Sequence, residues 1–345
     1  MKALFIGGTG TISAAISRLL LASGWDLTLL NRGNRNASVQ AATGGGGELR
    51  EIHCDINDEA AVAAALGDRH YDVVANFIAF NVSHVERDFR LFAGRCEQYL
   101  TLSSASAYQK PPADYLIDET TPLANPYWQY SRDKIAVENY LLDRYRSGFN
   151  VTVVRPSHTY DERSVPLGMH GKNGSWQILR RILDGKKVII HGDGTSLWTL
   201  THNSDFARAF AGLLGNVHAL GQAVQITGDE TLTWNQIYGI VAAALGKPLN
   251  AVHIASDFLV AAGRHYDFEG NLLGDKAQSA VFDNRKIKRL VPGWTATVRA
   301  DQGLRATVAH ILEHPECQRP DPEFDDWCDR VIAAQEQALL SIKPV

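Results

Sequence analysis

The chain has 345 residues with a formal net charge of −4, and it is 45% hydrophobic and 21% charged. These values are ordinary for a soluble globular protein, and the lack of a basic excess argues against a nucleic-acid-binding surface. The four cysteines lack the spacing of a disulfide framework or metal site, so we expect free thiols, no metal and a cytoplasmic protein. No apolar run has the length of a membrane span.

The first 160 residues alternate between short apolar segments and helical patterns. The expected strands are 2–6, 26–31, 48–56, 71–78, 98–104 and 150–156, and the expected helices are 11–24, 58–66, about 83–95 and one beginning near Tyr127. Repeated strand–helix units are typical of a parallel, doubly wound sheet. We therefore expect a Rossmann-type α/β domain that binds NAD(P) over residues 1–160.

Residues 161–345 begin with a polar, glycine-rich loop at 161–175, whose length indicates a functional role. Further elements follow, with helices expected at 176–184, 204–215 and 234–245 and strands at 187–192, 223–227 and 250–254. We expect a smaller mixed α/β portion that binds the substrate, with some of its segments returning to the Rossmann sheet.

The sequence FIGGTGTIS follows the first expected strand and opens directly into a helix. Its G-x-x-G-x-x-S frame permits a tight turn and lets the backbone approach a pyrophosphate. The helix N-terminus adds free N–H groups and the positive end of the helix dipole. A purely structural turn is the alternative. We expect a bound dinucleotide that contacts Gly7, Thr9, Gly10, Thr11 and Ile12.

The second expected strand ends in NRGNR, where NAD-binding folds commonly carry an acid for the ribose 2′-hydroxyl. The chain has Asn31, Arg32 and Arg35 at this place. A guanidinium suits a 2′-phosphate or stacks on adenine, so the cofactor is expected to be NAD or NADP, with NADP favoured. A solvated basic loop is the alternative. Asp55 and Ile56 are expected beside the adenine.

Tyr130 and Lys134 are four residues apart, which places both on one face of a helix, but many helices carry such a pair by chance. The strand ending at Ser104 makes the pair informative, because strand C-termini form the ligand crevice of a doubly wound sheet. A phenol with a pKa of about 10 is a poor base at neutral pH, and a nearby ammonium lowers that pKa. We expect these three residues to converge beside a nicotinamide, with Ser103 and Ser106 as competing hydroxyls.

These features occur together in one family. The segments GGTGTIS, CDI, LSSASAY, YSRDK, VRPSHTY and GDGTSLWTLTHNSDFA follow the family's order over roughly the first 210 residues. The chain thereby resembles the extended short-chain dehydrogenase/reductases of the NAD-dependent epimerase/dehydratase family. The resemblance implies that Tyr130 is the acid/base, that Lys134 lowers its pKa and holds the nicotinamide ribose, and that Ser104 binds the reacting oxygen. We further expect cofactor contacts from Ala79 and Pro156, and a homodimer in which the Tyr130 helix and its neighbour form a four-helix bundle.

The chain departs from the family pattern where the substrate is expected. The acidic pair that follows the catalytic hydroxyl residue in the family's dehydratases is replaced by Ala105 and Ser106, which disfavours elimination of water. His158 and Asp161 replace an Asn and a Gly, and Trp198 replaces an Arg that grips the diphosphate of sugar nucleotides. We expect Ser106, His158 and Trp198 to contact the substrate.

Loss of the arginine removes a strong phosphate contact, so a diphosphate-sugar substrate requires another cation, with Arg163 and Lys172 as candidates. We expect an oxidoreductase or epimerase acting on a secondary alcohol or ketone of a sugar-like small molecule. Epimerisation through a transient ketone is the leading version, and an NADPH-dependent ketone reductase is the alternative. A non-catalytic member that senses NAD(P) or binds RNA is a third hypothesis, although no nucleic acid or membrane partner is expected.

Overall fold

Seven parallel strands form the centre of the computed structural model, which describes residues 1–33, 39 and 46–342. Their order across the sheet is β12-β7-β5-β4-β1-β2-β3. The bounds are β1 Lys2–Ile6, β2 Asp26–Asn31, β3 Leu49–His53, β4 Tyr71–Asn76, β5 Cys96–Leu102, β7 Val151–Pro156 and β12 Gln222–Ile226. The order reverses direction between β1 and β4, which is where an open parallel sheet binds its ligand.

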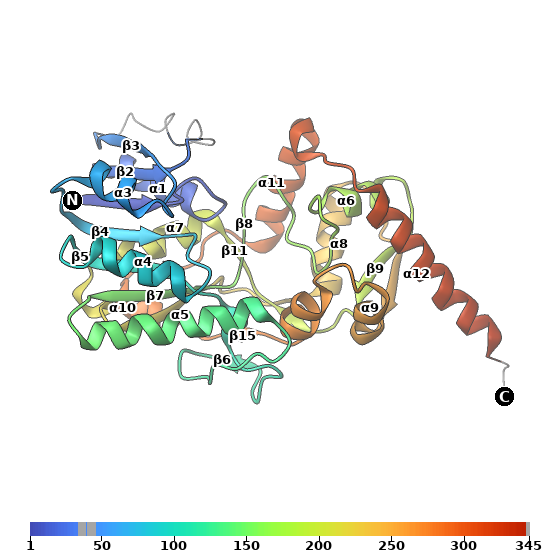
Figure 1. The fold of residues 1–345 in the computed structure, drawn as a ribbon. Coiled ribbons are helices and arrows are strands. Elements are labelled where there is room, and N and C mark those ends of the chain that lie inside the picture. The colour runs from blue at the N-terminus through green and yellow to red at the C-terminus, as the bar shows by residue number, and fades with distance from the viewer. Residues whose placement is uncertain (34–38, 40–45, 343–345) are drawn as a thin grey trace.

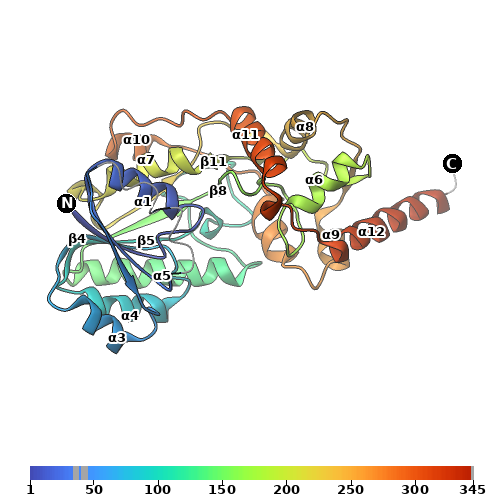
Figure 2. The ribbon, with the colours of Figure 1, turned by 90° about the horizontal axis from the view of Figure 1, so that it is seen from above.

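Helices cover both faces of the sheet, as Figure 2 shows. One face carries α1 Ser13–Ala22, α7 Asn203–Leu213 and α10 Arg285–Leu290, and the other carries α3 Glu59–Leu66, α4 Val82–Phe92 and α5 Gln129–Arg146. Because both faces are covered, the central strands are nearly continuous apolar runs, as in ALFI of β1 and VTVV of β7. The prediction of a Rossmann-type doubly wound sheet is confirmed.

The seventh strand, β12, is the strand expected at 223–227, in the portion from which some segments were expected to return to the sheet. β12 pairs in parallel with β7, and α7 packs beside α1. Residues from both sides of position 160 therefore form the sheet lobe, because a parallel strand needs a long crossover before it can return to the sheet.

The second lobe lies beyond the carboxyl ends of the strands (Figure 1). Its helices are α6 Trp176–Leu183, α8 Trp234–Ala244, α9 Ser256–Ala262, the π-helix η3 Glu269–Lys276, α11 Ala300–Glu313 and α12 Pro322–Ser341. Two-stranded ladders pair β9 Val188–His191 with β14 Ala251–Ile254, β8 His158–Tyr160 with β11 Leu200–His202, β10 Leu197–Trp198 with β13 Leu232–Thr233, and β6 Leu116–Ile117 with β15 Val281–Phe282. The 3₁₀ turns are η1 Ala105–Ala107, η2 Val217–Ala219 and η4 Pro315–Cys317. No helix in the described part of the chain is both long and apolar enough to cross a bilayer.

A buried ion pair fixes α5 against the sheet. Arg155, near the end of β7, donates from Nε and Nη2 to the Glu138 carboxylate of α5 at 3.0 and 2.6 Å. Arg155 is 4% exposed and Glu138 is 0% exposed. The Arg155 guanidinium also lies 4.9 Å from the ring centroid of Tyr108. This pair sets the position of the helix that carries Tyr130 and Lys134.

We predict that Glu138→Gln lowers the free energy of unfolding by about 3–5 kcal/mol, because the Arg155 charge stays buried without its counter-ion. Urea unfolding followed by circular dichroism measures the change. Glu59→Gln, which removes an exposed carboxylate paired with Arg90, is the control and should barely move the midpoint. Equal effects of the two substitutions would contradict a structural role for the buried pair.

Candidate active site

The glycine loop joins β1 to α1 and requires its first glycine. Gly7 has a φ of +80°, and a Cβ at this position would lie 2.7 Å from Cγ2 of Ile78. The Ser13 hydroxyl donates to Gly7 O at 2.7 Å and accepts from Gly10 N at 2.8 Å. The serine at the third position of the frame therefore holds the shape of the turn.

A groove of about 560 Å³, here called the glycine-loop groove, runs from this loop along the ends of β2, β3 and β4. Seven of the expected cofactor residues line it, namely Gly7, Thr9, Gly10, Asn31, Arg32, Asp55 and Ile56. Ile78, Phe80 and His84 line it as well and were not expected. Its volume lies within the range of about 300–1,000 Å³ that is typical of ligand sites.

Other expected cofactor residues lie elsewhere. Thr11 accepts a hydrogen bond from Arg163, and Ile12 packs against the hydrophobic core. Ala79 is buried and presents its carbonyl to Lys134, and Pro156 lines a second cavity described below. Arg35 lies outside the described residues.

The groove fits a dinucleotide by its own geometry. The loop backbone takes a turn that only glycine adopts readily, and no side chain caps the first turn of α1. The N–H groups of that turn can therefore bind a pyrophosphate.

Lys134 connects the groove to the end of the neighbouring strand. Its ammonium donates to Ala79 O at 2.6 Å and to Leu102 O at 2.7 Å, beyond β4 and at the end of β5. Nζ lies 5.6 Å from the ring centroid of Tyr130. Burial lowers the pKa of Lys134 to about 8, and Glu138 opposes that shift.

Tyr130 is held close to Ser104, and its acidity depends on burial and on that contact. Burial raises the pKa of the Tyr130 phenol, and the Ser104 side chain acts in the opposite direction through hydrogen bonding. Lys134 is not among the groups that shift this pKa, and its ammonium is directed to two backbone carbonyls, so the lowering of the Tyr130 pKa by Lys134 stays a prediction.

A chain of hydroxyls links the end of β5 to α5. Ser104 Oγ lies 2.8 Å from Ser106 Oγ, which lies 2.7 Å from Ser131 Oγ. Ser103, the other competing hydroxyl, is 1% exposed and its Oγ is enclosed without a hydrogen-bond partner in the described chain. The structure therefore separates Ser104 and Ser106, which face ligand space, from Ser103, which does not.

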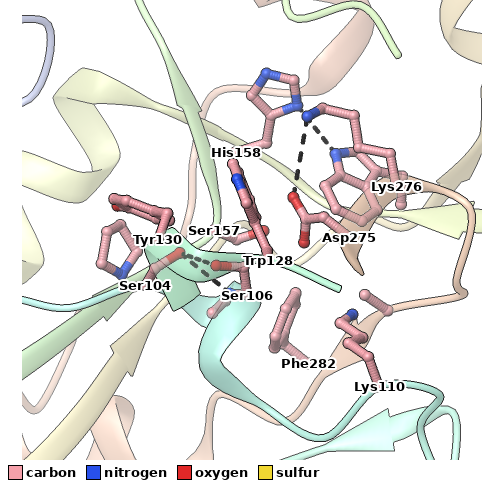
Figure 3. A pocket seen from close by; sticks show the side chains of 14 residues that line it. Ser104, Ser106, Lys110, Trp128, Tyr130, Ser157, His158, Asp275, Lys276 and Phe282 are labelled. Carbon is pink, nitrogen blue, oxygen red and sulfur yellow. Dashed lines mark hydrogen bonds and ion pairs between the residues drawn. The ribbon is translucent and has the colours of Figure 1, made fainter. Parts of the chain in front are cut away.

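Tyr130 and Ser104 line a second cavity of about 220 Å³, here called the inner cavity, which lies between the sheet edge and the second lobe (Figure 3). The expected substrate residues Ser106, His158 and Trp198 all line it. The sheet edge thus supplies the hydroxyl groups, and the second lobe supplies much of the opposite wall.

His158 and Trp198 belong to a packed aromatic group. Trp198 Nε1 donates to His158 Nδ1 at 3.1 Å, and the Trp198 ring stacks on Trp234 with centroids 5.3 Å apart. Burial, followed by the charges of Lys276 and His170, lowers the pKa of His158 well below its usual value. His158 is therefore neutral and accepts through Nδ1, so its ring N–H is on Nε2.

Several residues of the inner cavity were missed by the sequence analysis, chiefly Lys110, Trp128, Asp275, Lys276 and Phe282. Lys110 lies six residues after Ser104, just beyond the family segment LSSASAY, so a search of the residues that follow this segment would have identified it as a candidate. The pair at 275–276 ends the π-helix η3. Such helices are frequent at functional sites, but no pattern in the sequence marks this one.

The two cations proposed to replace the missing arginine lie elsewhere. Arg163 pairs with Asp161 and donates to Thr11 Oγ1 at 3.2 Å, so it contacts the glycine loop. Lys172 is exposed and lies 3.4 Å from Glu323. Neither side chain lines the inner cavity.

Comparison with known proteins gives a consistent result. A model of the NAD dependent epimerase/dehydratase family matches residues 3–226. The 2'-dehydrokanamycin reductase of Streptomyces kanamyceticus is 24% identical over 295 residues, which are 85% of this chain and 80% of the reductase. The chloroplast stem-loop binding protein of 41 kDa b from Arabidopsis thaliana is 27% identical over 254 residues, 72% of this chain and 64% of that protein.

Solved structures show the same fold. UDP-glucuronic acid 4-epimerase from Bacillus cereus, in complex with NAD, superposes with a TM-score of 0.71 over 91% of this chain and 97% of the epimerase, at 17% identity.

We predict that Lys134→Met weakens binding of NAD(P) and also lowers the unfolding temperature, because the carbonyls of Ala79 and Leu102 lose their donor. A buried acceptor left unpaired costs about 1–3 kcal/mol. Fluorescence titration with NAD(P)H and thermal unfolding measure the two effects. Arg146→Met, at the exposed end of the same helix, is the control. A change in stability alone would restrict Lys134 to a structural role.

Proposed function

The chain belongs to the NAD-dependent epimerase/dehydratase family, and from that premise we propose that it is an NAD(P)-dependent oxidoreductase acting on a secondary alcohol or ketone of a small, sugar-like molecule. One observation carries the proposal. Tyr130 and Ser104 line the inner cavity, and Lys134 connects that end of the sheet to the glycine-loop groove. A cofactor in the groove and a substrate in the cavity would meet at these residues.

Ser104, Tyr130 and Lys134 have different roles in the proposed reaction. A bound nicotinamide supplies or accepts hydride at the substrate carbon. The Ser104 hydroxyl holds the substrate oxygen by a hydrogen bond, and the Tyr130 phenol gives or takes the proton of that oxygen. Lys134 keeps α5 at the sheet edge and places a positive charge 5.6 Å from the Tyr130 ring, which favours the phenolate relative to the same site without it.

Burial raises the pKa of the Tyr130 phenol, so the phenol is protonated at neutral pH. A phenol that stays protonated at neutral pH can donate a proton to a carbonyl oxygen, which is the step that completes reduction of a ketone. Epimerisation uses the same residues in an oxidation followed by a reduction. Cofactor retention distinguishes the two, because an epimerase can keep its cofactor through gel filtration, whereas a net reductase must exchange it in every turnover.

RNA binding is the competing hypothesis, and one of the relatives is named for stem-loop binding. The net charge of −4 and the complete set of Ser104, Tyr130 and Lys134 favour the enzyme. Salt-dependent binding of a stem-loop RNA with a dissociation constant near that of NAD(P)H would support the competing hypothesis instead.

We also propose a cytoplasmic homodimer. All four cysteines are free thiols, as a reducing compartment favours. The helices α4 and α5 pack beside each other on one face of the sheet (Figure 2) and offer the surface for a four-helix bundle with a second copy. Light scattering coupled to gel filtration measures the mass.

We predict that Tyr130→Phe lowers turnover by about 10²–10⁴-fold, the usual contribution of a general acid–base group. Cofactor binding and folding should persist, because the ring is kept. Tyr140→Phe removes a hydroxyl from the same helix outside both sites and is the control. Near-normal turnover of an identified substrate by Tyr130→Phe would remove Tyr130 from the mechanism.

We predict that NADP(H) binds more tightly than NAD(H), because Arg32 lines the glycine-loop groove after β2 and a guanidinium can pair with the 2′-phosphate. Arg32→Ala should narrow the difference by about tenfold, in line with the loss of a charge-assisted hydrogen bond. Calorimetric titration with both cofactors measures it, with Arg50→Ala on the neighbouring strand as the control. Equal affinities in the unmodified protein would leave Arg32 as a solvated or adenine-stacking residue.

A further inference from the structure

Three ionisable side chains form one wall of the inner cavity, and the proposed reaction does not use them. They are Lys110, Asp275 and Lys276. In Figure 3 they lie across the cavity from Tyr130 and Ser104. They are the charged residues among those that line the cavity, since Tyr130 and His158 are held neutral.

Lys110 is a buried cation without a partner. The residue is 3% exposed, and its ammonium points toward the interior of the cavity in Figure 3. Across residues 1–33, 39 and 46–342, no hydrogen bond or ion pair of the Lys110 ammonium is found, and Asp275 is the carboxylate whose charge acts on it. Burying a charge is strongly unfavourable unless a partner compensates it. An anionic group of a ligand would supply the partner that the Lys110 ammonium lacks.

Lys276 is only partly compensated. Its ammonium donates to Asn271 Oδ1 at 3.0 Å and lies 4.0 Å from Asp275 Oδ2, at the outer limit of an ion pair. A second carboxylate, that of Asp267, acts on Lys276 from outside the cavity and accepts a hydrogen bond from Trp128 Nε1 at 2.7 Å. Among the groups that line the cavity, the Asp275 carboxylate can balance only one of the two ammonium groups of Lys110 and Lys276. By formal charge, one positive charge is left without a counter-ion.

The surroundings limit what can supply the missing negative charge. Trp198 and Phe282 line the cavity with aromatic rings. The volume of about 220 Å³ lies below the range of about 300–1,000 Å³ that is usual for drug-sized ligands. A nucleotide diphosphate is too large and too highly charged for this wall, whereas one small anionic group fits both its charge and its size.

We propose that the substrate carries one anionic oxygen group, a carboxylate or a phosphate monoester, which binds Lys110 and Lys276 while the reacting alcohol or ketone faces Tyr130 and Ser104. The inference rests on the proposed function and names its substrate class. The single uncompensated charge matches a carboxylate better than a doubly charged phosphate ester. Burial lowers the pKa of Lys110 and of Lys276, and the Asp275 carboxylate opposes both shifts, as a bound anion would.

The experiment compares matched pairs of ligands on the full chain with NADP⁺ present. Saturation-transfer NMR measures binding of D-glucuronate, D-galacturonate and D-gluconate against their neutral methyl esters, with glucose 6-phosphate against glucose and glucosamine as further arms. We expect at least one anion to bind about tenfold or more tightly than its neutral partner, as for a charge-assisted hydrogen bond. A preference for an acid identifies the carboxylate form, and a preference for the phosphate identifies the ester form.

Lys110→Met and Lys276→Met should each reduce that preference to within about threefold, whereas Lys110→Arg and the surface variant Lys172→Met should keep it. Lys110→Gln and Lys276→Gln replace any methionine variant that does not fold. The proposal is overturned if no anion binds more tightly than its neutral partner, if the preference survives both lysine substitutions, or if glucosamine binds more tightly than glucose.

Cofactor titration of the same proteins distinguishes a failure of the proposed function from a failure of the anionic-substrate proposal. Failure to bind either nicotinamide cofactor would overturn the proposed function itself. Normal cofactor binding together with Tyr130-dependent turnover of neutral sugars would leave the proposed function intact and reject only the anionic substrate.

Discussion

The buried ammonium of Lys134 is the contact on which the site depends. It donates to two carbonyls that follow neighbouring strands of the sheet, Ala79 O after β4 and Leu102 O at the end of β5. These hydrogen bonds fix the first turns of α5 above the edge of the sheet. Tyr130 lies one turn before Lys134 and Glu138 lies one turn after it, so the same helical face carries the phenol, the ammonium and the carboxylate that anchors Arg155.

This arrangement places the hydrogen bonds of Lys134 next to residues that line each of the two cavities. The carbonyl of Ala79 lies between Ile78 and Phe80, which line the glycine-loop groove, and Leu102 precedes Ser104, which lines the inner cavity. A charge buried this deeply is unfavourable unless it is hydrogen-bonded. The two carbonyls satisfy that requirement in the structure, and burial still brings the pKa of Lys134 to about 8.

The second lobe gives the inner cavity its individual character. Trp198 stands where the family resemblance implies an arginine, and its indole donates to His158 and stacks on Trp234. The cations of the cavity instead come from the loop after η1 and from the π-helix η3, far apart in sequence. In the proposed binding mode, the substrate's charged group is bound by this wall of the inner cavity, while Ser104 and Tyr130 bind the reacting group at the sheet edge.

The sequence by itself determined the sheet, the glycine loop and the residues around Tyr130, because each depends on local patterns: apolar strands, a strand–turn–helix glycine frame and a four-residue helical spacing. It also identified Ser106, His158 and Trp198 as lining residues through their place in ordered motifs. Only the tertiary structure decided that the strand expected at 223–227 pairs with β7, where Arg163 and Lys172 lie, and that Lys110 shares a cavity with Asp275 and Lys276. It also decided the direction of the Tyr130 pKa, because burial is a sum over neighbours distant in sequence. Charges that come together from positions more than a hundred residues apart, such as Lys110 and Asp275, leave no periodic pattern in the sequence, so their balance can be read only from the fold.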